Sequence, residues 1–209
     1  MAKNILRNVV MMTLMVFTPN ISIITLTDDT QFTVWDGILR LPIKDPSMKR
    51  LYLNNERIST IGAGEFSGLL SLETLFLSDN ELSQLQVGTF TCLVSLEWLN
   101  MDNNRLSEIT CNDFSDFHGL LKGLYLNNNR LTILRGNYFC NLTSLRELTL
   151  KNNEISYIET NAFSDLQSLE KLYLSNNKLT ILTSGIFSDL ISLKYLLLPR
   201  NLLSQIEVD

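Results

Sequence analysis

The sequence contains little of the material from which active sites are made. Its 209 residues include one histidine, His118, and three cysteines. No P-loop, G-x-G-x-x-G, H-E-x-x-H or G-x-S-x-G pattern occurs. The sequence therefore predicts no catalytic residue, no cofactor and no metal, and we do not expect the protein to be an enzyme.

The sequence also lacks a large excess of charge of either sign. Lysine and arginine number 17 against 22 acidic residues, which gives a net charge of −5. A balance this mild and mixed argues against nucleic acid or a strongly basic ligand as the partner. A second long hydrophobic run is missing as well, so the sequence predicts no membrane-spanning helix of the receptor type.

Leucine is abundant, and it recurs at fixed distances. The segments "LETLFLSDNELSQLQVGTFTCLVSL" and "LKGLYLNNNRLTILRGNYFCNLTSL" share the pattern L-x-x-L-x-L-x-x-N-x-L, followed by F-x-x-L. The units are 24 residues long, except for one of 25 residues whose extra residue lies between Phe114 and Leu121. Seven units, the last one incomplete, occupy residues 48–209. They begin at Met48, Leu72, Leu96, Leu121, Leu145, Leu169 and Leu193.

The pattern within each unit predicts a short strand with one buried face. Leu75 and Leu77 alternate with outward residues, as in a strand. One unit has nothing against which to bury its leucines, so neighbouring units must stack. Bulky phenylalanines, such as Phe90, hold the back of each coil further apart than the strands, which predicts a curved solenoid. A coiled coil or a helical repeat does not fit, because its period would be near 3.6.

One asparagine recurs after each strand except the first. There the chain turns inward and leaves main-chain groups unpaired, and an amide can both donate and accept hydrogen bonds. We therefore expect a ladder that bridges adjacent coils, made of Asn80, Asn104, Asn129, Asn153, Asn177 and Asn201. Glu56 occupies this position in the first unit, so we expect it to be partly exposed, and Glu56→Asn to stabilise the N-terminal coils.

These units resemble the typical 24-residue leucine-rich repeats of extracellular proteins, such as Toll-like receptor ectodomains, Slit and the small leucine-rich proteoglycans. The resemblance extends from about Met48 to Asp209. It implies an α/β-type solenoid, a curved horseshoe with a parallel β-sheet on the concave face and irregular or short helical segments on the convex face. It also implies a secreted or extracellular location, because cytosolic relatives usually use other unit lengths.

The outward strand positions are the candidate ligand-binding surface. Six aromatic residues occupy them, and aromatic anchors dominate binding hot spots. Aromatic residues also pack across strands for stability alone. The candidate ligand-binding residues on this face are Tyr52, Phe76, Trp98, Asn100, Tyr125, Asn127, Tyr173 and Tyr195.

The N-terminal segment has the anatomy of a signal peptide at residues 1–22. Lys3 and Arg7 precede an apolar run, and Pro19 follows it. A divergent N-terminus and a retained anchor are the alternatives. Residues 23–47 are expected to form a cysteine-free cap, in which Phe32 and Val34 supply an extra strand over the first coil.

The cysteines favour free buried thiols. Cys92 and Cys140 lie two coils apart, beyond the reach of a disulfide. A Cys92–Cys111 disulfide stays open as an alternative, and a metal or catalytic role is disfavoured. Two glycosylation sequons occur, at Asn20 and at Asn141, and Asn141 is the candidate on the back of the coils.

The last unit stops without a cap. We expect either that the chain is a fragment of a longer protein or that Leu202, Leu203 and Ile206 meet a partner, which would allow homo-association through this end. The favoured function is an extracellular module that binds a protein ligand in cell-surface recognition, adhesion or innate-type signalling. The alternatives are a structural matrix component of the proteoglycan type and a cytosolic repeat scaffold.

Overall fold

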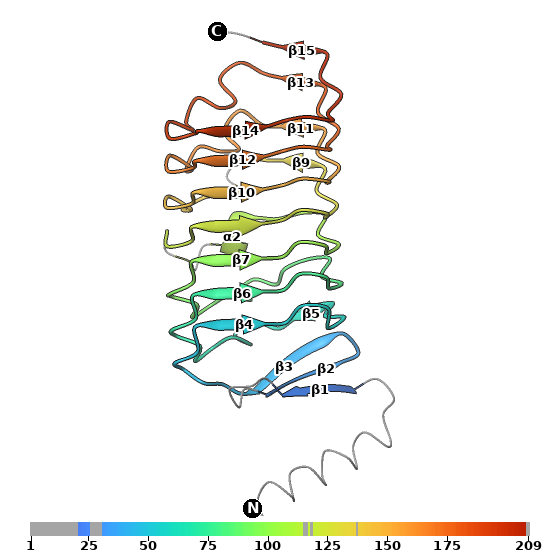
Figure 1. Cartoon of the computed structure of the whole chain (residues 1–209), viewed down its shortest axis with the longest axis vertical. Helices are drawn as coiled ribbons and strands as arrows, with labels where there is room; N and C mark the ends of the chain where they lie inside the picture. The colour runs from blue at the N-terminus through green and yellow to red at the C-terminus, as the bar shows by residue number, and fades with distance from the viewer. Residues whose placement is uncertain (1–20, 26–30, 115–116, 118, 137, 208–209) are drawn as a thin grey trace, which may run out of the picture.

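Each repeat contributes one three-residue strand to a parallel sheet of seven strands. The computed structural model describes residues 21–25, 31–114, 117, 119–136 and 138–207. The coils rise one above the next from the N-terminal to the C-terminal end, with sheet order β14-β12-β10-β8-β7-β6-β4 (Figure 1). The strands are β4 (Arg50–Tyr52), β6 (Thr74–Phe76), β7 (Trp98–Asn100), β8 (Gly123–Tyr125), β10 (Glu147–Thr149), β12 (Lys171–Tyr173) and β14 (Tyr195–Leu197).

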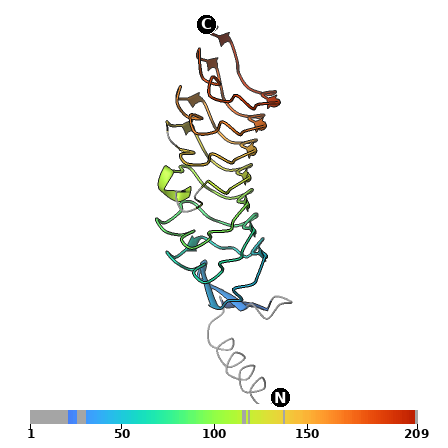
Figure 2. The same cartoon turned by 90° about the vertical axis from the view of Figure 1, so that its left-hand side faces the viewer.

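Strand register follows the repeat. Leu75 of β6 pairs with Leu99 of β7, and Leu99 pairs with Leu124 of β8. All three leucines are fully buried, while their neighbours on the strands face outward. Figure 2 shows the stack edge-on as a gentle curve with this sheet on its inner side. The predicted solenoid with a concave parallel sheet is therefore confirmed.

In the described part of the chain, the strands that the repeats contribute to the opposite flank are two residues long. Main-chain pairing there joins β9 to β11 and β13 to β15, each in parallel. The strands on this flank are β5 (Thr60–Ile61), β9 (Ile133–Leu134), β11 (Tyr157–Ile158), β13 (Ile181–Leu182) and β15 (Gln205–Ile206). Between the two flanks the back of the coils is mostly turns, as expected for the convex side.

The six ladder asparagines bridge consecutive coils in one direction. Asn129 accepts a hydrogen bond from Leu106 N (3.0 Å) and donates one to Met101 O (3.0 Å), both in the preceding coil. Asn80, Asn104, Asn153, Asn177 and Asn201 repeat this arrangement. Each asparagine thus closes the turn of the coil before its own.

A second, exposed column of amides lies directly before the ladder. Asn152 donates to Asn128 Oδ1 (2.7 Å), and Asn176 donates to Asn152 Oδ1 (2.6 Å). These residues have positive φ, between 54° and 56°, and asparagine tolerates this left-handed conformation better than most residues. The sequence reasoning did not identify this column, although the recurring Asn-Asn pairs carry its signal.

The 25-residue unit changes the back of the solenoid. The four-residue helix α2 (Cys111–Phe114) lies there, and Asp113 in its first turn accepts hydrogen bonds from the main-chain N and the hydroxyl of Thr110, the residue before the helix. Phe90 packs against Phe117 at 5.5 Å between ring centroids. Phe90 also stacks on Phe66 of the preceding coil, so this row of phenylalanine rings continues through Phe117, which Phe114 in turn contacts.

The prediction of free thiols is wrong for two of the three cysteines. Cys111 and Cys140 form a disulfide between adjacent coils, with their Cα atoms 5.3 Å apart, and Cys92 is free. The alternative Cys92–Cys111 pairing is also wrong. The two bonded cysteines are 29 residues apart, which differs from the repeat period, so they occupy different positions in their units. The repeat pattern brings equivalent positions together and therefore could not predict this pairing.

The N-terminal cap is a meander of three antiparallel strands. It comprises β1 (Ile21–Thr25), β2 (Gln31–Trp35) and β3 (Ile38–Ile43). Phe32 and Val34 are buried in the core, and β3 pairs in parallel with β5 of the first coil. Gly37 follows Asp36 in the two-residue hairpin turn with φ of 75°, and a Cβ there would lie 2.2 Å from Ser59 Oγ.

Some of the predictions fall outside the described residues, namely those for the segment 1–20 with the Asn20 sequon and for His118. The expected end of the signal peptide, at residue 22, falls inside β1. At the other end Leu202 is 64% exposed and Ile206 is 63% exposed, whereas Leu203 is half-buried.

Candidate functional site

One column of outward residues on the concave face lies just beyond the strand ends and contains Asn54, Ser78, Asp102, Asn127, Lys151, Ser175 and Pro199. Two further columns lie within the strands of the seven-stranded sheet. Strand register defines them, because it pairs each outward residue with its equivalent on the next strand. The middle column contains Tyr52, Phe76, Asn100, Tyr125, Thr149, Tyr173 and Leu197. The column at the strand starts contains Arg50, Thr74, Trp98, Gly123, Glu147, Lys171 and Tyr195.

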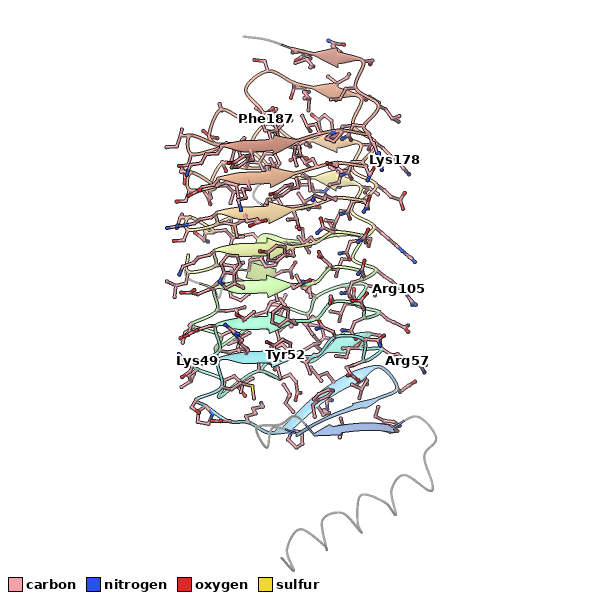
Figure 3. The ribbon with its side chains drawn as sticks, in the orientation of Figure 1. Lys49, Tyr52, Arg57, Arg105, Lys178 and Phe187 are labelled. Atoms are coloured by element: carbon pink, nitrogen blue, oxygen red, sulfur yellow. A yellow bond between two sulfur atoms is a disulfide. The ribbon has the colours of Figure 1, made fainter. Side chains whose placement is uncertain are left out.

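The aromatic residues do not form one continuous row. Tyr52 stacks on Phe76 with 4.7 Å between ring centroids and 5° between planes. Asn100 then interrupts the middle column, because it pairs with Phe76 on one side and Tyr125 on the other. Tyr52 projects from the face of the sheet in Figure 3 and is 48% exposed. The first stack is thus open to a partner.

The second stack joins two columns. Trp98 belongs to the column at the strand starts, yet its ring packs against Tyr125 at 6.3 Å between centroids. It does so by lying over Gly123, where a Cβ would come within 2.2 Å of the indole. Gly123 therefore makes room for Trp98. The sequence prediction missed this role, although a glycine within a strand pattern is the signal of such a close approach.

Polar candidates on the face are tied into the sheet. Asn127 donates from its main-chain N to Asp102 Oδ1 (2.7 Å) and from Nδ2 to Oδ2 (3.2 Å), and its Oδ1 accepts from Lys151 N (2.9 Å). Asn100 Oδ1 accepts from Asp102 N (2.9 Å). Burial raises the pKa of Asp102, and the hydrogen bonds from Asn127 oppose that effect. Asn127 thus supports the surface, because both ends of its amide are already bonded.

In the C-terminal half of the concave face, Tyr173 contacts a charged side chain, whereas the tyrosines of the two stacks contact aromatic rings. Lys151 Nζ lies 4.3 Å from the centroid of the Tyr173 ring, a cation–π contact. Burial, together with the charges of Glu147 and Asp102, raises the pKa of Tyr125 to about 12. Thr149, between Tyr125 and Tyr173 in register, is buried. Tyr195 stands apart at 58% exposed.

The glycosylation candidate lies on the back of the solenoid. Asn141 is exposed, and its main-chain N donates to Asp165 Oδ2 (2.9 Å). Its side-chain nitrogen, the atom that a glycan would modify, lies 3.7 Å from Cys140 Sγ. The site therefore faces away from the concave sheet, beside the disulfide.

Within the residues that the structure describes, two kinds of feature are missing. No helix is long and apolar enough to cross a membrane. No group of three or more histidine, cysteine or acidic side chains is placed to hold a metal ion.

Comparison with known families identifies the repeat. The leucine rich repeat pattern matches residues 46–106, 119–179 and 143–203. These segments cover more than half of the sequence, and the chain belongs to the leucine rich repeat family. No curated protein matches the chain.

Two solved structures with the same fold illustrate the similarity. A leucine-rich repeat protein of Leptospira interrogans is 27% identical with a TM-score of 0.66, over 78% of this chain and 43% of its own. A chain from the glycosylated Toll–Spatzle complex of Drosophila is 25% identical with a TM-score of 0.71, over 78% of this chain and 23% of its own. The present chain thus spans less than half the length of either structure.

Proposed function

We propose that the protein is an extracellular module that binds a protein ligand on the concave face of the seven-stranded sheet. The observation that carries this proposal is the pair of half-exposed aromatic stacks, Tyr52–Phe76 and Trp98–Tyr125. Large aromatic side chains supply most of the energy of protein interfaces, and stacking restrains them before a partner arrives. The seven strands give a surface about 30 Å long, which suits an ordinary protein interface.

The disulfide supports the extracellular part of the proposal. Cys111–Cys140 would persist in an oxidising compartment, whereas cytosolic disulfides are rare. This weighs against the alternative of a cytosolic scaffold. Similarity to a chain of the Toll–Spatzle complex, described as a hub in development and innate immunity, favours a recognition role over a matrix role.

The binding surface is tested by alanine substitutions on the two faces. Trp98→Ala and Tyr125→Ala are each expected to weaken partner binding by more than about 1 kcal/mol, because they remove the central anchors. Gln167→Ala and Asp189→Ala, exposed on the back, are the controls and should change little. The partner is first identified by cell-surface screening, and affinity is then measured by calorimetry. Loss of binding in the back variants alone would place the surface elsewhere.

The extracellular location is tested separately through Asn141. Expression of the whole chain in a secreting eukaryotic cell is expected to yield glycosylated protein in the medium, because Asn141 is exposed within its sequon. Glycosidase treatment should increase gel mobility, and Asn141→Gln should remove that shift. Unglycosylated protein retained in the cytosol would argue against this part of the proposal while leaving the binding face untouched.

A further inference from the structure

A column of seven charged residues runs along the flank where the strands of the seven-stranded sheet begin. Each residue directly precedes its strand, and main-chain hydrogen bonds hold neighbours in register, as from Glu170 N to Arg146 O (2.9 Å). In order, the column contains Lys49, Glu73, Glu97, Lys122, Arg146, Glu170 and Lys194. Figure 3 labels Lys49 on this flank, opposite the flank that bears Arg105 and Lys178.

Six members of this charged column pair with a neighbour of opposite sign. Lys122 bonds to Glu97 (2.6 Å) and Lys194 bonds to Glu170 (2.8 Å), while Lys49 and Glu73 form the third pair. Arg146 stands between Lys122 and Glu170, whose charged ends are already engaged. Within the described residues its guanidinium makes no ion pair or hydrogen bond. Arg146 is thus a surplus positive charge in an otherwise paired column.

A depression of about 280 Å³ lies at this unpaired arginine. Besides Lys122, Arg146 and Glu170, three serines line it, each two residues before a member of the charged column. The hydroxyls of Ser144, Ser168 and Ser192 have no hydrogen-bond partner in the described part of the chain. The depression therefore combines one free guanidinium with hydroxyl groups that are available to donate.

The same flank lacks this combination in the earlier repeats. Ser95 holds the equivalent serine position, but its hydroxyl already donates to Leu70 O (2.8 Å). One coil later the position is Leu120, which is exposed and has no hydroxyl. Ser71 also has a hydroxyl without a partner in the described part of the chain, but the charged residues beside it, Lys49 and Glu73, pair with each other. Free serines and an unpaired arginine therefore coincide at the later coils, which makes the depression a local feature rather than a property of every repeat.

We infer that this depression binds a singly charged oxyanion, a carboxylate or a sulfate ester, carried by a ligand. A guanidinium binds such groups through two parallel hydrogen bonds, and the serine hydroxyls extend the donor set. Glu170 limits the charge that the site accepts. Its carboxylate stays ionised, because the hydrogen bond and charge of Lys194 lower its pKa, with Arg146 a smaller cause. A doubly charged phosphate would meet this carboxylate and be disfavoured.

The test uses the isotopically labelled full chain and small probes. Methyl sulfate, acetate and inorganic phosphate are titrated at constant ionic strength with chloride as the reference, and the Arg146 Nε–H and Ser168 amide signals are followed by NMR. A saturable shift with methyl sulfate or acetate is expected, and the stronger of the two identifies the source of the oxyanion. Arg146→Gln should weaken binding by about tenfold or more, whereas Arg105→Gln, on the opposite flank, should not.

Two further variants keep the test decisive. Arg146→Lys retains the charge but cannot form the two parallel hydrogen bonds, so it should bind the oxyanion more weakly than the unaltered chain. This variant serves the same purpose if Arg146→Gln does not fold. Glu170→Gln should strengthen binding and admit phosphate. Shifts that match chloride for every probe, or binding unchanged in Arg146→Gln, would overturn the inference.

Discussion

The first and second repeats differ at the ladder position, where Glu56 stands in one and Asn80 in the other. Asn80 accepts from Glu56 N (3.1 Å) and Ile58 N (2.9 Å) and donates to Leu53 O (2.7 Å). The turn of the first coil is therefore closed by the asparagine of the second. Glu56 forms no such bonds to the cap in the described part of the chain, and it is half-buried, in line with the expected partial exposure.

This difference shows that the ladder has a direction. Every ladder asparagine bonds to the coil that precedes it, so the first coil has no preceding repeat turn for an asparagine to close. A missing asparagine there removes no bridge between coils. The expectation that Glu56→Asn stabilises the N-terminal coils therefore rests only on relief of the partly buried charge, and we expect a small effect.

The largest expected effect comes from the covalent link between the third and fourth repeats. The Cys111→Ser, Cys140→Ser double variant opens a loop of 29 residues and should lower the free energy of unfolding by about 3 kcal/mol. Chemical denaturation with residue-specific hydrogen exchange would measure it, since repeats can unfold separately. Cys92→Ser, at the free cysteine, is the matched control. A loss below about 1 kcal/mol would mean that the ladder alone holds these coils.

Removal of one central ladder residue should have the next largest effect. Asn129→Leu leaves Leu106 N buried without a partner and removes one of the two hydrogen bonds that Met101 O accepts, the other being from Asn104. It should therefore destabilise the protein by about 2 kcal/mol. Exposed Asn152→Ser, in the outer amide column, is the comparison, and it should cost less. Denaturant titration measures the free energy of unfolding of both variants. Equal losses for the two variants would contradict the distinction between the buried ladder and the exposed column.

Glu56→Asn should have the smallest effect, within about 0.5 kcal/mol of the unaltered chain. Burial raises the pKa of Glu56 in the folded protein. The protonated side chain therefore contributes to the stability of the folded state below the unfolded pKa, and this contribution is lost as pH rises through the folded pKa. The variant should therefore gain slightly at pH 7 and gain nothing near pH 3, as thermal denaturation at both values would show. A gain as large as the loss in Asn129→Leu would mean that Glu56→Asn does form a bridge to the cap.

The sequence predicted which residues face outward on the concave face, but not the contacts between their side chains. Alternation along each strand placed Tyr52, Phe76 and Tyr125 on the outer surface, where the structure has them. It could not show that Trp98 leans across Gly123 to reach Tyr125, because that contact joins positions that are not equivalent in the repeat. Nor could it show that Asn127 is bonded to Asp102, which makes it a support of the surface.

By itself the sequence determined the period, the buried leucines and the position of the asparagine ladder. These features depend on residues that recur every 24 positions, and stacking brings equivalent positions together whatever lies between them. The tertiary structure alone decided the Cys111–Cys140 bond, the direction of the ladder and the unpaired state of Arg146. Such contacts depend on where the extra residue is accommodated and on which neighbour each side chain turns toward, and only the packed coils fix both.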